Sequence, residues 1–140
     1  MQLNLSSFKS VRDFAKQFNE TEKRLDVLVN NAGGATNYRF TEDGFIETYQ
    51  MNYLSHFLLT LLLLEKLMES APSRIINVSS IMHSFANAKL KFENFAKYPK
   101  SEYNPSKAYN QSKLAQVLFT KELSHHLKGK KELACKILSP

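Results

Sequence analysis

Tyr109 and Lys113 are the pair of residues whose types and spacing most directly suggest proton-transfer chemistry. They stand four residues apart in a segment with helical periodicity, so the phenol and the ammonium group share one helix face and can reach a common site. A neighbouring ammonium stabilises a phenolate, which makes Tyr109 a candidate general acid and base. Taken alone, such a pair is more often part of an exposed, solvated helix face.

Two further polar residues have both a chemical and a structural explanation. Ser80 is the second serine after an apolar, strand-like run, so its hydroxyl could donate a hydrogen bond to a substrate oxygen or cap the next segment. Asn52 lies in the most apolar helical segment, where an amide without hydrogen-bond partners costs about 1–3 kcal/mol. A satisfied core amide is the simpler explanation of Asn52, and a site residue is the alternative.

The segment 30–33 reads Asn-Asn-Ala-Gly and follows another strand-like run. Its glycine gives a flexible backbone that a flat ring can approach closely, although a plain turn explains the same residues.

The hydrophobic pattern predicts alternating helices and strands. Ser6 or Ser7 can cap a first helix, and short β-branched runs alternate with longer helical segments after it. In chain order we expect a helix after Ser7, a strand over 25–29, a helix over 41–67, a strand over 74–78, a helix over 108–127 and a strand over 133–138. Segment 89–101 is charged, aromatic and aperiodic, and we interpret it as a surface excursion.

This order predicts an α/β fold, a partial Rossmann-like doubly wound parallel sheet with three αβα layers. Strands that are separated by helices pair in parallel and are buried on both faces. In such sheets, ligands bind outside the carboxyl ends of the strands. Segment 30–33 and Ser80 each follow a predicted strand, so we expect both at this edge.

Composition excludes several classes of protein. The chain has 140 residues, a formal net charge of +6 and a hydrophobic content of 43%, which suits one domain with a core. Its basic residues are scattered along amphipathic stretches, so we expect no nucleic-acid partner. Cys135 is the only cysteine, which rules out an intrachain disulfide and a cysteine-based metal site.

No targeting or membrane-spanning pattern stands out in the sequence. The amino terminus has the pattern of neither a secretory signal nor a transit segment. The longest apolar run, 57–64, is far shorter than the roughly 20 residues that a membrane span needs. We therefore expect an intracellular protein with no membrane span in this chain, and the sequence assigns no compartment.

Together these features resemble the short-chain dehydrogenase/reductase family. Its motifs occur in the family's order: Asn30-Asn31-Ala32-Gly33, Asn52, Ser80, and Tyr109 with Lys113 as Tyr-x-x-x-Lys. Finer detail resembles the retinol dehydrogenase branch: Leu28-Val29 before the first motif, Asp43-Gly44-Phe45, His56-Phe57-Leu58-Leu59-Thr60, Ser70-Ala71-Pro72-Ser73-Arg74 and Ser112-Lys113-Leu114-Ala115. The extra residues between Ser80 and Tyr109 also suit that branch. The resemblance covers nearly the whole chain.

The resemblance implies a role for each of these residues. Tyr109 would exchange a proton with the substrate oxygen while hydride passes to or from a nicotinamide. Lys113 would stabilise the Tyr109 phenolate and hydrogen-bond the nicotinamide ribose. Ser80, at the family's position in the Ser79-Ser80 pair, would orient the substrate oxygen, and Asn52 would hold a water that links Lys113 to solvent. The adenosine-ribose side of the cofactor would be lined by Asn31, Ala32 and Gly33.

The resemblance also implies parts that residues 1–140 do not contain. The family's Gly-x-x-x-Gly-x-Gly turn for the cofactor phosphates does not occur, and the four glycines are Gly33, Gly34, Gly44 and Gly129. We expect that turn, the residue that selects NAD or NADP and the carboxyl-terminal substrate segment outside this chain; the resemblance favours NADP over NAD. Residues 1–140 would then be the C-terminal part of one NAD(P)-binding Rossmann-like domain, incomplete at both ends.

Two main functional hypotheses follow. In the first, the parent protein is an oxidoreductase acting on an apolar alcohol or carbonyl such as retinol or retinal, and the 140-residue chain alone is inactive and poorly stable. In the second, the chain is a non-catalytic relative or short isoform whose long helices form a dimerisation or regulatory surface. A homo-oligomer through those helices suits both hypotheses. A basic module for an anionic surface is a third interpretation, and membrane attachment in this branch is often set by an amino-terminal segment.

Overall fold

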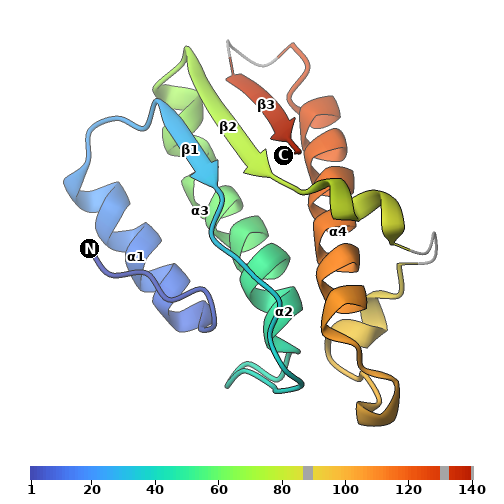
Figure 1. The fold of residues 1–140 in the computed structure, drawn as a ribbon. Helices are drawn as coiled ribbons and strands as arrows, with labels where there is room; N and C mark the ends of the chain where they lie inside the picture. Colours follow the sequence, from blue (N-terminus) through green and yellow to red (C-terminus); the bar gives the residue numbers. More distant parts are fainter. Residues whose placement is uncertain (87–89, 130–132, 140) are drawn as a thin grey trace.

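Three short strands form a parallel sheet that lies in front of the helices in Figure 1. The computed structural model describes residues 1–86, 90–129 and 133–139. The strands are β1 (Val27–Asn30), β2 (Ser73–Val78) and β3 (Leu133–Leu138), in the order β1-β2-β3. Helix-containing segments connect them, and both pairings are parallel. The predicted α/β class is confirmed, and the strand predicted over 133–138 has the observed bounds.

Three main helices lie on one face of this sheet. They are α1 (Phe8–Thr21), α3 (Ser55–Glu69) and α4 (Pro105–His126). Figure 1 shows α3 and α4 behind the strands and α1 beside α3. The predicted cap of the first helix is confirmed, because the side chain of Ser7 accepts a hydrogen bond from the backbone of Ser10. Helix α4 begins three residues earlier than predicted, after the capping residue Asn104.

The prediction that a helix begins at Thr41 is wrong. The helix begins with α2 (Glu47–Tyr49), and residues 41–45 form a turn in which Gly44 has φ +80°. An antiparallel bridge between Phe40 and Ile46 closes this turn. Thr-x-Asp-Gly resembles a helix start, but the left-handed glycine directs the chain into a turn instead.

A π-helical turn separates α2 from α3. It covers η1 (Gln50–Leu54), so Asn52 lies in the middle of a widened stretch of an otherwise continuous helix. Single π-helical turns inside α-helices are frequent at functional sites.

The hydrophobic core has three parts, which join the helices to one another and to the sheet. One part packs α1 on α3 through Val11, Ala15, Leu59 and Leu63. The second packs α3 and α4 on the strands through Leu67, Ile75, Phe119, Leu123, Leu127 and Leu133. The third lies beyond the sheet and contains Ile46, Tyr49, Phe95, Tyr98, Ala108 and Ala115.

The third part of the core corrects the interpretation of 89–101 as a surface excursion. Phe95 is only 2% exposed and Tyr98 only 4% exposed. The rings of Tyr49 and Phe95 stack with centroids 4.3 Å apart. This segment contains the short helices η3 (Phe92–Phe95) and η4 (Lys100–Glu102), and it packs Phe95 and Tyr98 against Tyr49 of α2. Residue 89 lies outside the described residues.

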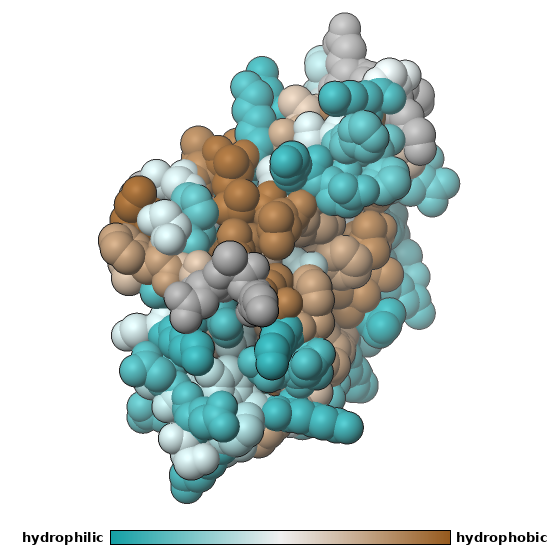
Figure 2. Space-filling view, turned by 90° about the vertical axis from the view of Figure 1, so that its right-hand side faces the viewer, coloured by the Kyte–Doolittle hydropathy of each residue, from teal (hydrophilic) through white to brown (hydrophobic). Residues whose placement is uncertain are grey.

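The opposite face of the sheet is open in the part of the chain that the structure describes. Val27 is 46% exposed and Val29 is 53% exposed, so the prediction that both faces are buried is wrong for β1. In register with them, Arg74, Ile76, Val78, Ala134, Lys136 and Leu138 form the same outer face. Figure 2, seen from the side of β3 and α4, shows a hydrophobic band between hydrophilic areas. The described residues thus supply the sheet and one helix layer.

None of the helices within residues 1–86, 90–129 and 133–139 has the length and apolar character that a membrane span requires.

Candidate functional site

The predicted site residues gather where β1 and β2 end and the first half of α4 passes. β1 leads into the loop 31–34, and β2 leads into Ser79 and Ser80. The Lys113 side chain binds the last residue of β2, because its Nζ donates to the carbonyl of Val78 at 3.0 Å. Ser79 Oγ in turn donates to the carbonyl of Lys113 at 3.0 Å. These two bonds fix α4 against the carboxyl end of β2.

Tyr109 and Lys113 lie together as their spacing predicts. Lys113 Nζ is 5.5 Å from the centre of the Tyr109 ring. Tyr109 is half-buried, whereas Lys113 is 3% exposed. Burial lowers the pKa of Lys113. A buried ammonium beside an accessible phenol is an arrangement that can stabilise a phenolate.

Ser79 and Ser80 have different environments. Ser79 is buried and uses its hydroxyl within the fold. Ser80 is half-exposed, and its Oγ accepts a hydrogen bond from the backbone of Met82 at 3.3 Å as the cap of η2 (Ile81–Phe85). The Ser80 oxygen therefore caps a helix, as one of the two explanations predicts. The Ser80 hydroxyl proton has no protein acceptor among the described contacts.

Asn52 is fully buried and holds the loop after β1. Its Nδ2 donates to Gly34 O at 3.0 Å and to Ser112 Oγ at 2.9 Å, and its Oδ1 accepts from Gly34 N at 2.9 Å. The explanation as a satisfied core amide is thus confirmed. Within the described residues, no direct hydrogen bond joins Asn52 to Lys113.

The three predicted cofactor-lining residues lie on the surface of that loop. Asn31, Ala32 and Gly33 are exposed beyond the end of β1. A Cβ on Gly33 would stand 2.4 Å from Asn52 Oδ1, so the close approach of loop and π-helical turn requires glycine here. Asn52 and Ser112 link this loop to the turn of α4 that carries Lys113.

Two buried polar residues next to Lys113 were missed by the sequence analysis. Gln116 Oε1 is 3.5 Å from Lys113 Nζ, and Gln116 Nε2 is 3.0 Å from His56 Nδ1. Burial lowers the pKa of His56 to about 4, and the charge of Lys113 acts in the same direction. Their spacing could have identified them, because residues three or four apart on a helix lie on one face. His56 is four residues after Asn52, and Gln116 is three residues after Lys113.

A row of buried polar side chains connects the ends of β1 and β2 to the helices by hydrogen bonds. Asn30 Nδ2 donates to Thr60 Oγ1 at 2.9 Å and to Asn77 Oδ1 at 2.7 Å. Asn77 Nδ2 donates to Thr120 Oγ1 at 2.8 Å. This row ties β1 and β2 to α3 and α4, which fixes the edge where the site residues gather.

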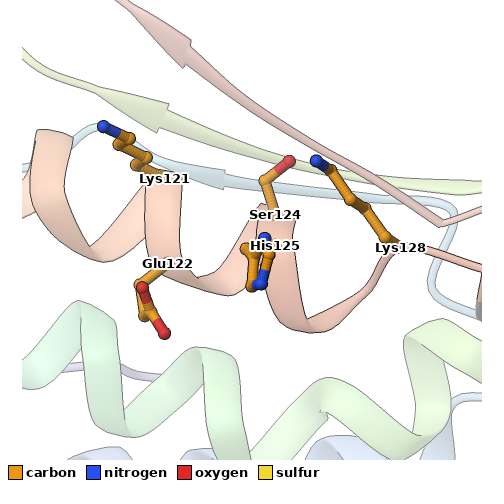
Figure 3. Close-up of a pocket in the computed structure, with 5 residues that line it drawn as sticks. All are labelled: Lys121, Glu122, Ser124, His125 and Lys128. Carbon is orange, nitrogen blue, oxygen red and sulfur yellow. The ribbon is translucent and has the colours of Figure 1, made fainter.

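A separate surface pocket of about 400 Å³ lies at the other end of α4. Figure 3 shows its lining residues Lys121, Glu122, Ser124, His125 and Lys128. At a rise of 1.5 Å per residue, His125 lies about 24 Å along the helix from Tyr109. None of the predicted site residues lines it.

Comparison with known proteins gives a family match over the whole chain. The sequence profile of the family described as short chain dehydrogenase matches residues 1–140. Retinol dehydrogenase 13 of Mus musculus is 52% identical over 128 residues, which cover 91% of this chain and 37% of that protein. Retinol dehydrogenase 11 of Homo sapiens is 52% identical over 128 residues, which cover 91% of this chain and 39% of that protein. The chain thus spans less than two fifths of these relatives.

Comparison with solved structures shows that the whole fold of this chain matches part of larger proteins. A crystal structure of an uncharacterized protein from Mycobacterium paratuberculosis has a TM-score of 0.84 and 38% identity, and the match covers 100% of this chain and 49% of that one. The Pseudomonas aeruginosa RhlG/NADP active-site complex has a TM-score of 0.74 and 27% identity, with 100% of this chain and 51% of that one covered.

Proposed function

The chain belongs to the short-chain dehydrogenase family, and we propose that it forms the proton-transfer side of an oxidoreductase site acting on an alcohol or carbonyl of an apolar substrate. The relatives named retinol dehydrogenase make retinol and retinal the first substrates to test. The observation that carries the proposal is the buried Lys113 ammonium held 5.5 Å from the ring of the accessible Tyr109.

Tyr109 would act as the general acid and base. Its phenol would give a proton to a carbonyl oxygen or take one from an alcohol, and the neighbouring ammonium of Lys113 would stabilise the phenolate. Ser80 would donate its free hydroxyl proton to the substrate oxygen and so orient it. Placing these three groups at the carboxyl ends of the strands agrees with where ligands bind parallel sheets.

A nicotinamide cofactor fits the residues at this edge. Gly33 offers an exposed backbone without a side chain, and the ammonium of Lys113 has only neutral carbonyl acceptors in the described contacts. Lys113 would hydrogen-bond the ribose next to the nicotinamide, and Asn31, Ala32 and Gly33 would line the adenosine-ribose side. When bound, the nicotinamide supplies the hydride acceptor or donor. We propose NADP over NAD from the family resemblance, in line with the NADP complex of the RhlG relative.

Asn52 keeps two proposed roles. Its side chain positions the cofactor loop through Gly34 and the catalytic helix through Ser112. The relay role, in which Asn52 holds a water that links Lys113 to solvent, stays a prediction.

The test is turnover by the complete protein that carries this chain. Purified protein is assayed with NADP and NAD against retinol, retinal and a series of apolar alcohols. Tyr109→Phe lowers kcat by about a hundredfold or more, because the acid and base is lost, while cofactor binding measured by fluorescence titration is kept. Tyr103→Phe is the matched control, since the Tyr103 hydroxyl donates to the carbonyl of Thr36 and Tyr103 is not among the proposed site residues.

Undiminished turnover in Tyr109→Phe contradicts the proposed role. A complete protein that binds no nicotinamide nucleotide but forms a stable oligomer supports the alternative of a dimerisation or regulatory module.

A further inference from the structure

Lys113 depends on neutral acceptors for its position. Its Nζ lies 3.0 Å from Val78 O and 3.5 Å from Gln116 Oε1. None of the ion pairs found within residues 1–86, 90–129 and 133–139 includes Lys113. The Val78 carbonyl is fixed by the sheet, so the Gln116 amide is the acceptor whose orientation can change.

The charge of Lys113 determines how the Gln116 amide is turned. An ammonium has three donors and no acceptor, whereas a glutamine amide has an acceptor oxygen at one end and two donor hydrogens at the other. Gln116 is 1% exposed, so water does not compensate for a wrong orientation. Oε1 must therefore face Lys113, and the amide hydrogens must face His56.

This orientation fixes the protonation of His56. Gln116 Nε2 can donate to His56 Nδ1, 3.0 Å away, only if Nδ1 carries no proton. His56 is 3% exposed and must then be neutral, with its proton on Nε2. Its lowered pKa, caused mainly by burial, agrees with a neutral ring.

The π-helical turn supplies the competing arrangement. The carbonyl of Asn52 lies 3.1 Å from the same Nδ1 and could accept a proton from it. In that tautomer Gln116 would lose its acceptor on His56, and turning the amide to compensate would place its hydrogens against the ammonium of Lys113. Only the tautomer with the proton on Nε2 satisfies Gln116 and Lys113 together.

We infer that Gln116 and His56 are positioning residues for Lys113: the ammonium at one end and neutral His56, with its proton on Nε2, at the other hold the Gln116 amide in one orientation, and its oxygen keeps the ammonium beside Tyr109. The inference rests on the proposed function where it assigns a catalytic use to Lys113. The hydrogen-bond chain itself is independent of turnover.

The first test is the tautomer of His56 in the complete protein. Long-range ¹H–¹⁵N NMR spectra of histidine-¹⁵N-labelled protein show which ring nitrogen carries the proton, and His56→Gln assigns the signals among the four histidines. We expect the proton on Nε2 in the wild type. In Gln116→Glu, a carboxylate replaces the donor, so the proton moves to Nδ1. A wild type with the proton on Nδ1 overturns the inference.

The second test is kinetic. Gln116→Leu removes one of the two acceptors of Lys113 and lowers kcat about tenfold with little change in KM for the alcohol, because a group near the reacting atoms is displaced without loss of substrate contacts. The control is Gln111→Leu, which removes another buried amide of α4, one that accepts from the Tyr49 hydroxyl at 2.6 Å. Circular dichroism shows whether each variant folds, and Gln116→Glu provides the tautomer readout should Gln116→Leu not fold.

The outcomes separate the two proposals. Equal kcat values for Gln116→Leu and Gln111→Leu overturn the positioning role. An inactive wild type whose His56 proton is on Nε2 defeats the proposed function and supports the hydrogen-bond chain.

Discussion

Asn52 and Gly34 are joined by two hydrogen bonds, one in each direction. The Gly34 amide donates to Asn52 Oδ1 at 2.9 Å, and Asn52 Nδ2 donates to the Gly34 carbonyl at 3.0 Å. The loop that follows β1 is therefore held by a side chain from the π-helical turn, and the same side chain reaches α4 through Ser112. One buried amide thus sets the spacing between the proposed cofactor loop and the helix of Tyr109.

We expect Gly33→Ala to destabilise the protein by about 1–3 kcal/mol, the usual cost of overpacking a close contact. The new Cβ would stand 2.4 Å from Asn52 Oδ1 and would push the loop away from the π-helical turn. The measurement is chemical unfolding of the complete protein together with cofactor affinity. Gly34→Ala is the matched control, because a Cβ there meets nothing within 4 Å. Equal effects of the two variants contradict this account.

Ser79→Ala and Ser80→Ala should have opposite profiles. Ser79→Ala removes a buried bond to the Lys113 carbonyl and costs about 1 kcal/mol of unfolding free energy. Ser80→Ala leaves stability almost unchanged but lowers kcat by about tenfold to a hundredfold, because a donor to the substrate oxygen is lost. Steady-state kinetics and thermal unfolding of both variants decide between the two serines. A larger loss of kcat in Ser79→Ala contradicts the choice of Ser80.

The last strand and the cap of the first helix could be predicted from the sequence because their signals are local. The apolar run 133–138 carries a strand pattern in its own residues, and Ser7 caps the helix that directly follows it. The motif residues Tyr109 and Lys113 could be paired for the same reason, since a helix fixes residues four apart.

Other features depend on contacts between distant segments and could not be predicted. The burial of Phe95 and Tyr98 has no periodicity to reveal it and arises from packing on Tyr49. The hydrogen-bond chain from Lys113 through Gln116 to His56 joins α4 and α3. Gln116 and His56 are 60 residues apart in the sequence. A periodic apolar pattern describes which face of a helix is buried, but it does not say which polar groups meet there.

The buried His56 should make stability fall in mild acid. Its pKa is lowered from 6.5 to about 4, so the unfolded chain binds a proton between these values that the folded chain does not. The unfolding free energy then decreases as the pH falls from 6.5 to about 4, by a total on the order of 3 kcal/mol. Unfolding curves of wild type and His56→Leu across this range isolate the contribution. His125→Leu, at an exposed position, is the control, and an unchanged pH dependence in His56→Leu contradicts the prediction.

The open face of the sheet should make the 140-residue chain associate with itself. Val29 is 53% exposed on β1, whose outer edge carries no paired strand in the described residues, and exposed apolar edges are sites of aggregation. We expect Val29→Lys to raise the soluble, monomeric fraction of the chain measured by light scattering. Leu118→Lys is the control, because Leu118 is 47% exposed but lies on α4. If Leu118→Lys alone restores the monomer, the helices and not the sheet form the association surface.

In the complete protein the same Val29→Lys should lower the unfolding free energy by about 2–3 kcal/mol if further residues cover the face, because a lysine would then replace a buried valine.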